Sequence, residues 1–309
     1  MVDVIQRLRA SVASVYLGNA NAVDRLICCL IAGGHTLIED VPGVGKTVLA
    51  MALARSVDCD FTRLQLTPDL LPSDLLGVSI FDRDTSDFDF KKGPIFTNVL
   101  LADEVNRASP RTQSALLEAM NEASVSVDGV TRALEQPFMV IATQNPHDFE
   151  GAYALPENQL DRFLMRIGVG YPDAEAEADV LLRRPATTTL PDVEPVLSRD
   201  EVIALREQAQ RVHVERSLVE YIVALAAATR EHEELRFGLS PRGGLALAQA
   251  ARATAVMAGR DYCIPEDILS NLLAVCSHRV AVKQQYENGD GKSAERALEH
   301  AASRVASPV

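Results

Sequence analysis

The chain has 309 residues, 47% of them hydrophobic, so it is long enough to form two domains around a sizeable buried core. Its formal net charge of -13 and its aromatic content of only 5% disfavour general binding to nucleic acid or to an acidic membrane surface. The 5 cysteines show no metal-binding spacing, and we expect them to be reduced and mostly buried.

Two helices are predicted at the N-terminus. Apolar residues recur at helical spacing over residues 2–16, and a second apolar helix over residues 20–33 ends at a pair of glycines. Arg7 and Arg9 interrupt the first of these segments, so we expect no signal peptide. No apolar run approaches the roughly 20 residues that span a bilayer. These features predict a cytoplasmic protein without a membrane span.

A glycine-rich loop, DVPGVGKT at residues 40–47, follows a strand expected at residues 36–39. It matches the end of the P-loop pattern GxxxxGK[ST], although Asp40 occupies the first glycine position. In such a loop backbone N–H groups surround a phosphate, Lys46 reaches the β- and γ-phosphates, and the Thr47 hydroxyl binds Mg2+. The alternative is a chance turn before a core helix. The expected nucleotide-binding residues here are Gly43, Val44, Gly45, Lys46, Thr47 and Val48.

A second apolar run, residues 98–102, ends in the carboxylates Asp103 and Glu104. It is typical of a buried parallel strand, and ligands of open α/β sheets bind where such strands end. Asp103 would then orient Mg2+ through water, and Glu104 would polarise the attacking water as a general base. The alternative, a solvated acidic turn, is disfavoured because a P-loop precedes it in the same chain.

Strands and helices alternate over residues 1 to about 172, including two hairpins, at residues 78–90 and around Asp128-Gly129. The pattern predicts an α/β domain over residues 1–183, with a mostly parallel sheet covered by helices on both faces. A linker is expected at residues 184–197, followed by a helical domain over residues 198–309 without strands. Capping boxes are predicted at Ser198/Glu201 and at Ser217/Glu220.

Three further polar residues are candidates for the site. Asn145 follows the apolar strand expected at residues 138–142 and would touch the γ-phosphate, unless it only makes an Asn-Pro turn. Arg162, supplied by a neighbouring subunit, would stabilise charge in phosphoryl transfer; the alternative is an ion pair with Asp161. Arg242 stands in the first turn of a helix, where the dipole disfavours a cation, so either a phosphate contact or a solvated side chain fits.

Several blocks of the sequence resemble the AAA+ ATPases, and more narrowly the MoxR family. They are EDVPGVGKT (39–47), LTPDLLPSD (66–74), LADEVNRASP (101–110), SALLEAM (114–120), ATQNP (142–146) and LDRF (160–163). They occur in the family's order over nearly the whole chain. The resemblance implies an AAA+ P-loop domain followed by a smaller all-α lid domain.

The resemblance also implies roles for single residues. Lys46 and Thr47 resemble the Walker A residues, and Asp103 and Glu104 the Walker B residues. Asn145 is similar to sensor 1, Arg162 to an arginine finger and Arg242 to sensor 2, acting on the nucleotide of its own or of a neighbouring subunit. Leu17 and Gly18 resemble the segment that lies against adenine.

Members of this family hydrolyse ATP with Mg2+ as homo-oligomeric rings, commonly hexamers, with ATP at the subunit boundaries. They act as chaperone-like motors that mature partner proteins, including by metal-cofactor insertion. Their partners often carry a von Willebrand factor A domain, which this chain has no room for and which we expect on another protein. Two alternatives stay open: a switch that acts by ATP binding alone, and a nucleic-acid motor, which the acidic hairpin tip at residues 82–87 disfavours.

Overall fold

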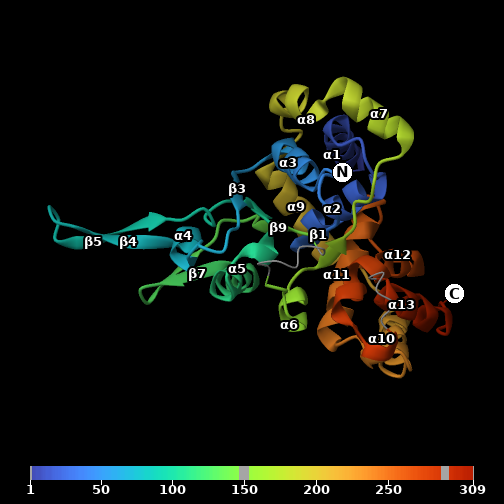
Figure 1. Cartoon of the computed structure of the whole chain (residues 1–309). Helices are drawn as coiled ribbons and strands as arrows, with labels where there is room; N and C mark the ends of the chain where they lie inside the picture. Colours follow the sequence, from blue (N-terminus) through green and yellow to red (C-terminus); the bar gives the residue numbers. More distant parts are fainter. Residues whose placement is uncertain (1, 146–152, 287–291, 309) are drawn as a thin grey trace.

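The computed structural model describes residues 2–145, 153–286 and 292–308. Figure 1 shows the whole chain. At its centre lies a parallel sheet of five described strands, in the order β10-β1-β9-β6-β3. The strands are β1 (Thr36–Glu39), β3 (Phe61–Gln65), β6 (Val99–Asp103), β9 (Met139–Gln144) and β10 (Met165–Ile167). All of β6 is buried, which explains its unbroken apolar sequence. The predicted parallel sheet is confirmed.

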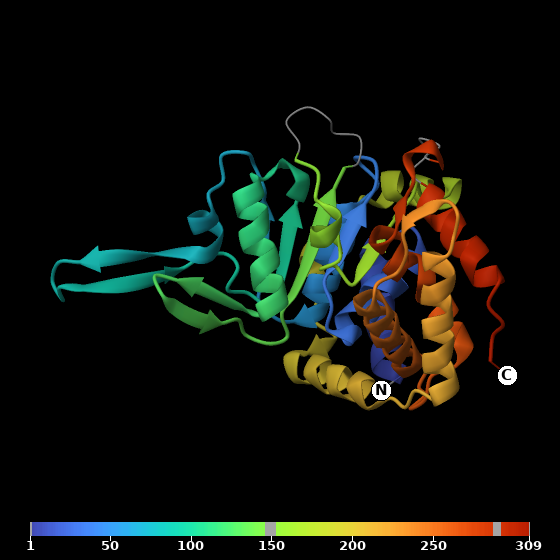
Figure 2. The ribbon, with the colours of Figure 1, turned by 90° about the horizontal axis from the view of Figure 1, so that it is seen from below.

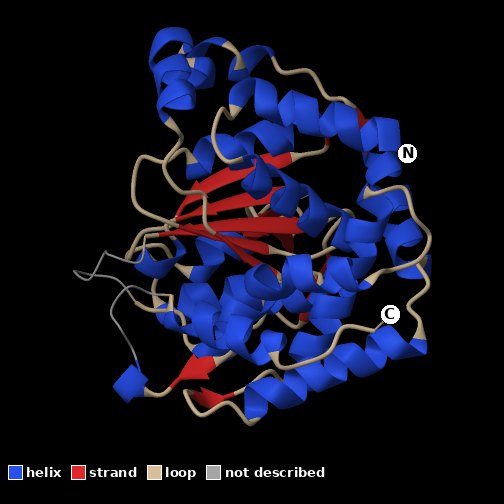
Figure 3. Ribbon diagram, turned by 90° about the vertical axis from the view of Figure 1, so that its right-hand side faces the viewer, coloured by secondary structure: helices blue, strands red, loops and turns tan. Residues whose placement is uncertain are grey.

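Helices cover both faces of this sheet (Figure 2, Figure 3). The covering helices are α1 (Val2–Val15), α2 (Ala20–Ala32), α3 (Lys46–Ser56) and α5 (Pro110–Glu122). Ile38 and Leu101 belong to the core that also holds the apolar residues of α1, α2 and α3. Leu37 and Leu100 belong to the opposite core, which holds those of α5. Neighbouring residues of a strand enter different cores because side chains alternate between the faces of a sheet.

Two hairpins extend from the α/β part, as predicted (Figure 1). The longer one consists of β4 (Gly77–Asp82) and β5 (Asp87–Lys92), after the short helix α4 (Pro72–Leu76). The shorter one consists of β7 (Ser124–Val127) and β8 (Val130–Ala133). Asp128 and Gly129 form its turn with φ values of 54° and 75°, which is the conformation that an Asp-Gly hairpin turn requires.

The segment predicted as a linker, residues 184–197, is folded. It contains α8 (Pro185–Thr188) and a 3-10 turn (Leu190–Asp192), which lie against α1 and α3. Leu190 is buried, and β11 (Leu197–Ser198) pairs with β2 (Val57–Asp58). Two short helices precede it, α6 (Glu157–Leu160) and α7 (Ala174–Arg183). The polar, proline-containing composition of residues 184–197 did not indicate the long-range contacts of this segment with α1, α3 and β2.

The C-terminal region is mostly helical, as predicted. Its helices are α9 (Arg199–Arg211), α10 (Arg216–Arg230), α11 (Pro241–Met257), α12 (Pro265–Cys276) and α13 (Ser293–Ser303). Helices α9 and α11 pack against α2, so this region shares one core with the α/β part. None of the helices in the described part of the chain is long and apolar enough to cross a membrane.

Two predictions for the C-terminal region are wrong. A short antiparallel pair, β12 (Leu235–Phe237) with β13 (Ala281–Val282), lies among the helices, and these strands are too short for an alternating pattern to be recognised. The capping box at Ser198 is present at the start of α9. The one predicted at Ser217 is absent, because α10 begins at Arg216 and Glu220 pairs with Arg216 instead, at 2.9 Å.

Candidate functional site

The loop between β1 and α3 has the backbone conformation of an anion-binding loop. Gly43 and Gly45 have φ values of 85° and 89°, in the left-handed region that favours glycine. A Cβ atom added at Gly43 would meet nothing within 4 Å, so the loop is open on this side. Helix α3 begins at Lys46, which places the positive end of its dipole at the loop. This arrangement can hold a phosphate group.

Lys46 lies between the ends of two neighbouring strands. Its Nζ donates to the backbone oxygens of Asp40 at 2.5 Å and of Gln144 at 2.9 Å. The pKa of Lys46 is lowered, because the effect of burial outweighs that of the nearby carboxylates of Asp40 and Asp103. Gln144 ends β9, so pairing of β1 with β9 brings the next residue, Asn145, to the same edge. Asn145 is buried, and Pro146 after it lies outside the described residues.

The carboxylate of Asp103 is the polar centre of this edge and is buried. It accepts hydrogen bonds from Thr143 Oγ1 at 2.6 Å and from Arg63 Nη2 at 2.7 Å and Nε at 3.1 Å. The Thr47 hydroxyl lies 3.3 and 3.4 Å from the two carboxylate oxygens. Hydroxyl and carboxylate oxygens are ligands that Mg2+ prefers, so Thr47 and Asp103 fit the predicted magnesium site.

Glu104 is held in an unusual backbone conformation directly after β6. Its φ of 58° lies in the left-handed region, and its N–H donates to Thr143 Oγ1 at 3.0 Å. Its side chain is 39% exposed and forms an ion pair with Arg107, at 3.0 Å between Oε2 and Nε. The carboxylate is therefore accessible at the edge where a nucleophilic water would have to lie. Sequence reasoning assigned no role to Thr143 and could not place Arg107, although Arg107 stands three residues after Glu104.

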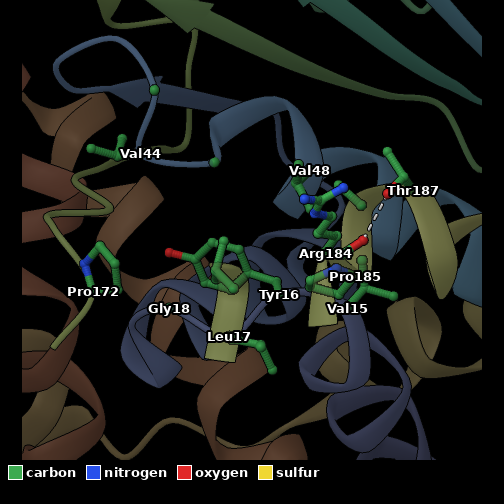
Figure 4. A pocket seen from close by; sticks show the side chains of 14 residues that line it. Val15, Tyr16, Leu17, Gly18, Val44, Val48, Pro172, Arg184, Pro185 and Thr187 are labelled. Atoms are coloured by element: carbon green, nitrogen blue, oxygen red, sulfur yellow. Dashed lines mark hydrogen bonds between the residues drawn. The ribbon is translucent and has the colours of Figure 1, made fainter. Parts of the chain in front are cut away.

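A largely apolar pocket of about 340 Å³ adjoins the loop (Figure 4). The predicted Leu17 and Gly18 line it together with Tyr16, whose ring lies 3.4 Å from the position of a Cβ added at Gly45. Residues from the segment around α7 and α8, which sequence reasoning missed, also line it. The remaining lining residues are Val15, Gly43, Val44, Gly45, Val48, Pro172, Val180, Arg184, Pro185, Ala186 and Thr187. An apolar pocket beside a phosphate loop suits the base of a nucleotide.

Arg162 and Arg242 lie apart from this edge. Leu164 N–H donates to His35 O at 2.8 Å, at the amino end of β1, so the segment carrying Arg162 lies opposite the P-loop end of the strand. Arg162 Nη1 donates to Leu117 O of α5 at 2.7 Å. Arg242 lies 3.5 Å from Asp161, next to Arg162. The structure thus brings the P-loop, Asp103, Glu104 and Asn145 together and places the two arginines elsewhere.

Two sequence families match parts of the chain. The family described as "ATPase family associated with various cellular activities (AAA)" matches residues 35–165, which hold the P-loop, Asp103, Glu104, Asn145 and Arg162. The family described as "AAA lid domain" matches residues 227–301, which hold Arg242.

Whole-length relatives are also found. YeaC of Bacillus subtilis, an uncharacterized protein, is 46% identical over 96% of this chain and 92% of its own length. The chaperone MoxR1 of Mycobacterium tuberculosis is 41% identical over 91% of this chain and 76% of its own length. The crystal structure of a candidate ATPase from Cytophaga hutchinsonii matches with a TM-score of 0.90 at 38% identity, covering 100% of this chain and 96% of that one.

Proposed function

Because the chain belongs to the MoxR family of AAA+ ATPases, we propose that it hydrolyses ATP and uses the reaction to remodel a partner protein. The observation that supports this most directly is the distance of 3.3 Å between the Thr47 hydroxyl and the Asp103 carboxylate. This contact joins the P-loop to the end of β6, which carries Asp103 and Glu104, beside the apolar pocket. A nucleotide whose base occupies this pocket would have its phosphates at Lys46, Thr47 and Glu104.

Thr47 and Asp103 would hold Mg2+, which supplies positive charge that offsets the charge of the phosphates during transfer. Asp103 is oriented for this task by Thr143 and Arg63. Lys46 adds a second positive charge at the β- and γ-phosphates. Its ammonium now binds two backbone oxygens, which phosphate oxygens would replace.

Glu104 is the proposed general base. It accepts a proton from the attacking water, and Asn145 orients that water at the γ-phosphate. In this structure Oε2 of Glu104 is paired with Arg107 Nε.

Arg162 and Arg242 are proposed to act on the nucleotide of a neighbouring copy. The 4 residues of β1 span about 13 Å, and Arg162 and the P-loop lie at opposite ends of that strand. Arg162 is also bonded to α5, on the sheet face opposite α3. A site that needs a cation from another copy requires a homo-oligomer with a repeated head-to-tail interface, such as the hexameric ring that the family resemblance implies.

The hairpin β4–β5 is proposed to contact the partner protein. Phe81 and Phe88, whose ring centroids lie 5.3 Å apart, are 51% and 66% exposed near the tip. Aspartates at residues 82, 84 and 87 surround the tip. Exposed aromatic rings beside carboxylates suit a protein surface better than a phosphate backbone, because carboxylates repel phosphates. The proposed partner carries a von Willebrand factor A domain, and metal-cofactor insertion is one form that its maturation would take.

Steady-state ATP turnover per protomer, measured against protein concentration, tests this proposal. We expect turnover to rise cooperatively with concentration, to vanish in Lys46→Ala, and to fall about 100-fold or more in Glu104→Gln with nucleotide binding retained. Mixing Arg162→Ala with Lys46→Ala should restore activity that neither variant has alone. Unchanged turnover in Glu104→Gln would exclude the mechanism, whereas a mixture without activity would exclude only the shared site.

A further inference from the structure

Arg279, a buried arginine in the 3-10 turn (Ser277–Arg279) after α12, binds the segment that carries Arg162. Its side chain is only 3% exposed. Its Nε donates to Asp161 Oδ1 at 2.8 Å, and Nη2 donates to Phe163 O at 2.7 Å and to Asp161 O at 3.1 Å. Its Nη1 donates to Leu164 O at 3.0 Å. One guanidinium from the helical region thus holds the residues on both sides of Arg162.

The same segment has two further contacts with the helical region. His278 Nε2 lies 2.9 Å from Phe163 O, and burial holds the pKa of His278 well below its usual value, so this ring is neutral. Arg242 lies 3.5 Å from the second carboxylate oxygen of Asp161. Three side chains of the helical region, Arg279, His278 and Arg242, thus contact this segment.

The charges at Asp161 explain how Arg162 stays available. The ion pairs found for Asp161 in the described part of the chain are with Arg279 and Arg242, and not with the adjacent Arg162. Arg162 itself donates to a neutral backbone oxygen, Leu117 O. The carboxylate of Asp161 therefore does not offset the charge of Arg162. The alternative interpretation of the sequence, an ion pair between these two residues, is not found.

We infer that Arg279 is a positioning residue for the shared active site: it fixes residues 161–164 so that Arg162 is presented to the nucleotide of the neighbouring copy. The position of one copy's helical region then controls hydrolysis in the next copy. This inference rests on the proposed function, specifically on Arg162 acting between subunits. A guanidinium is needed because a lysine ammonium cannot donate to Asp161, Phe163 and Leu164 in the same fixed plane.

Arg279→Lys is the first test, with nucleotide affinity, kcat and thermal midpoint measured on the full chain. We expect kcat to fall about 10- to 100-fold, as misplacement of a positioned group does, and nucleotide affinity to stay within about twofold, because the P-loop lies at the other end of the sheet. Arg206→Lys is the matched control. Arg206 is partly buried and joins α9 to α2 through Leu30 O, but it does not contact residues 161–164.

Subunit mixing separates positioning from a general loss of structure. In an equal mixture of Arg279→Lys with Lys46→Ala, an intact P-loop meets a correctly held Arg162 at about a quarter of the interfaces, so about a quarter of the wild-type turnover should return. If Arg279→Lys is too unstable to assemble, Asp161→Asn, which removes the same ion pair, replaces it with the same expectation.

Each outcome either supports or overturns the inference that Arg279 positions Arg162. Unchanged kcat in a folded Arg279→Lys, an equal loss of kcat in Arg206→Lys, or no recovery on mixing would overturn the inference. If the mixture of Arg162→Ala with Lys46→Ala regains activity while that of Arg279→Lys does not, only the role of Arg279 fails. If the Arg162→Ala mixture is also inactive, the shared site of the proposed function fails, and the inference with it.

Discussion

Arg63 donates two hydrogen bonds to a single oxygen of Asp103, from Nη2 at 2.7 Å and from Nε at 3.1 Å. Arg63 lies on β3 and Asp103 ends β6, so the contact follows from the pairing of two strands that are far apart in sequence. Arg63 is about half exposed, whereas Asp103 is buried. A buried carboxylate needs such a partner, because an uncompensated charge is costly away from water.

Removing the guanidinium of Arg63 should destabilise the nucleotide-free protein. We expect Arg63→Gln to lower the free energy of unfolding by about 1.5–3 kcal/mol, the usual value of hydrogen bonds to a charged group. The loss should become smaller with Mg2+ and ADP, because the metal then compensates the charge of Asp103. Urea unfolding with and without Mg2+ and ADP measures the loss of stability and its reduction by the bound metal and nucleotide. Arg83→Gln, at the exposed hairpin tip, is the control; equal effects of the two substitutions would contradict the prediction.

Tyr16 should contribute to nucleotide affinity. Its ring forms a wall of the apolar pocket beside Gly18. Stacking of a base on an aromatic ring contributes about 1–3 kcal/mol, so we expect Tyr16→Ala to weaken ADP binding about 5- to 150-fold. Tyr16→Phe keeps the ring and should bind within about twofold of the wild type. Titration with a fluorescent ADP analogue provides the measurement, and full affinity in Tyr16→Ala would show that the base lies elsewhere.

His35 should make stability depend on pH below neutrality. Its Nδ1 accepts from Val140 N–H at 2.9 Å, so Nε2 carries the proton and donates to Met120 O at 3.0 Å. Burial lowers the pKa of His35 from 6.5 to about 4 in the folded protein. Between these pH values the unfolded chain binds a proton that the folded protein does not. Stability is thus complete above about pH 6.5 and declines toward pH 4, by at most about 1.4 kcal/mol per pH unit.

His35→Gln keeps the donor to Met120 and removes the titrating group. We expect this variant to be less stable at neutral pH but to lose less stability on acidification than the wild type. Urea midpoints measured between about pH 5 and pH 7 give the two slopes. Parallel slopes would assign the acid sensitivity to other groups.

The two predicted capping boxes provide a matched pair of substitutions. Ser198 Oγ accepts from Glu201 N–H at 3.2 Å, and Glu201 Oε2 accepts from Ser198 N–H at 2.8 Å. Ser198→Ala should therefore lower the free energy of unfolding by about 1 kcal/mol. Ser217 is exposed inside α10 and caps nothing, so Ser217→Ala should stay within about 0.5 kcal/mol of the wild type. A larger loss in Ser217→Ala, in chemical denaturation, would contradict this assignment.

Local sequence predicted most elements of the α/β part. The glycine positions of the P-loop, the buried strand before Asp103 and the Asp-Gly hairpin all depend on backbone conformations and burial patterns of a few consecutive residues. The boundaries of β1 were predicted to the residue for the same reason. Prediction failed where contacts are long-range or elements are very short, as in α8 and the pair β12–β13.

The sequence by itself determined which residues are suited to bind phosphate, hold a metal ion or accept a proton. Each motif is a short stretch, and its chemical properties depend on its own residues. Only the tertiary structure decided which of them meet. The order of the parallel strands places Asp103, Glu104 and Asn145 at the P-loop and leaves Arg162 one strand length away. Packing of the helical region onto that distant end attaches Arg279 and Arg242 to Asp161. Such contacts join residues about 80 to 120 positions apart, and no local periodicity encodes them.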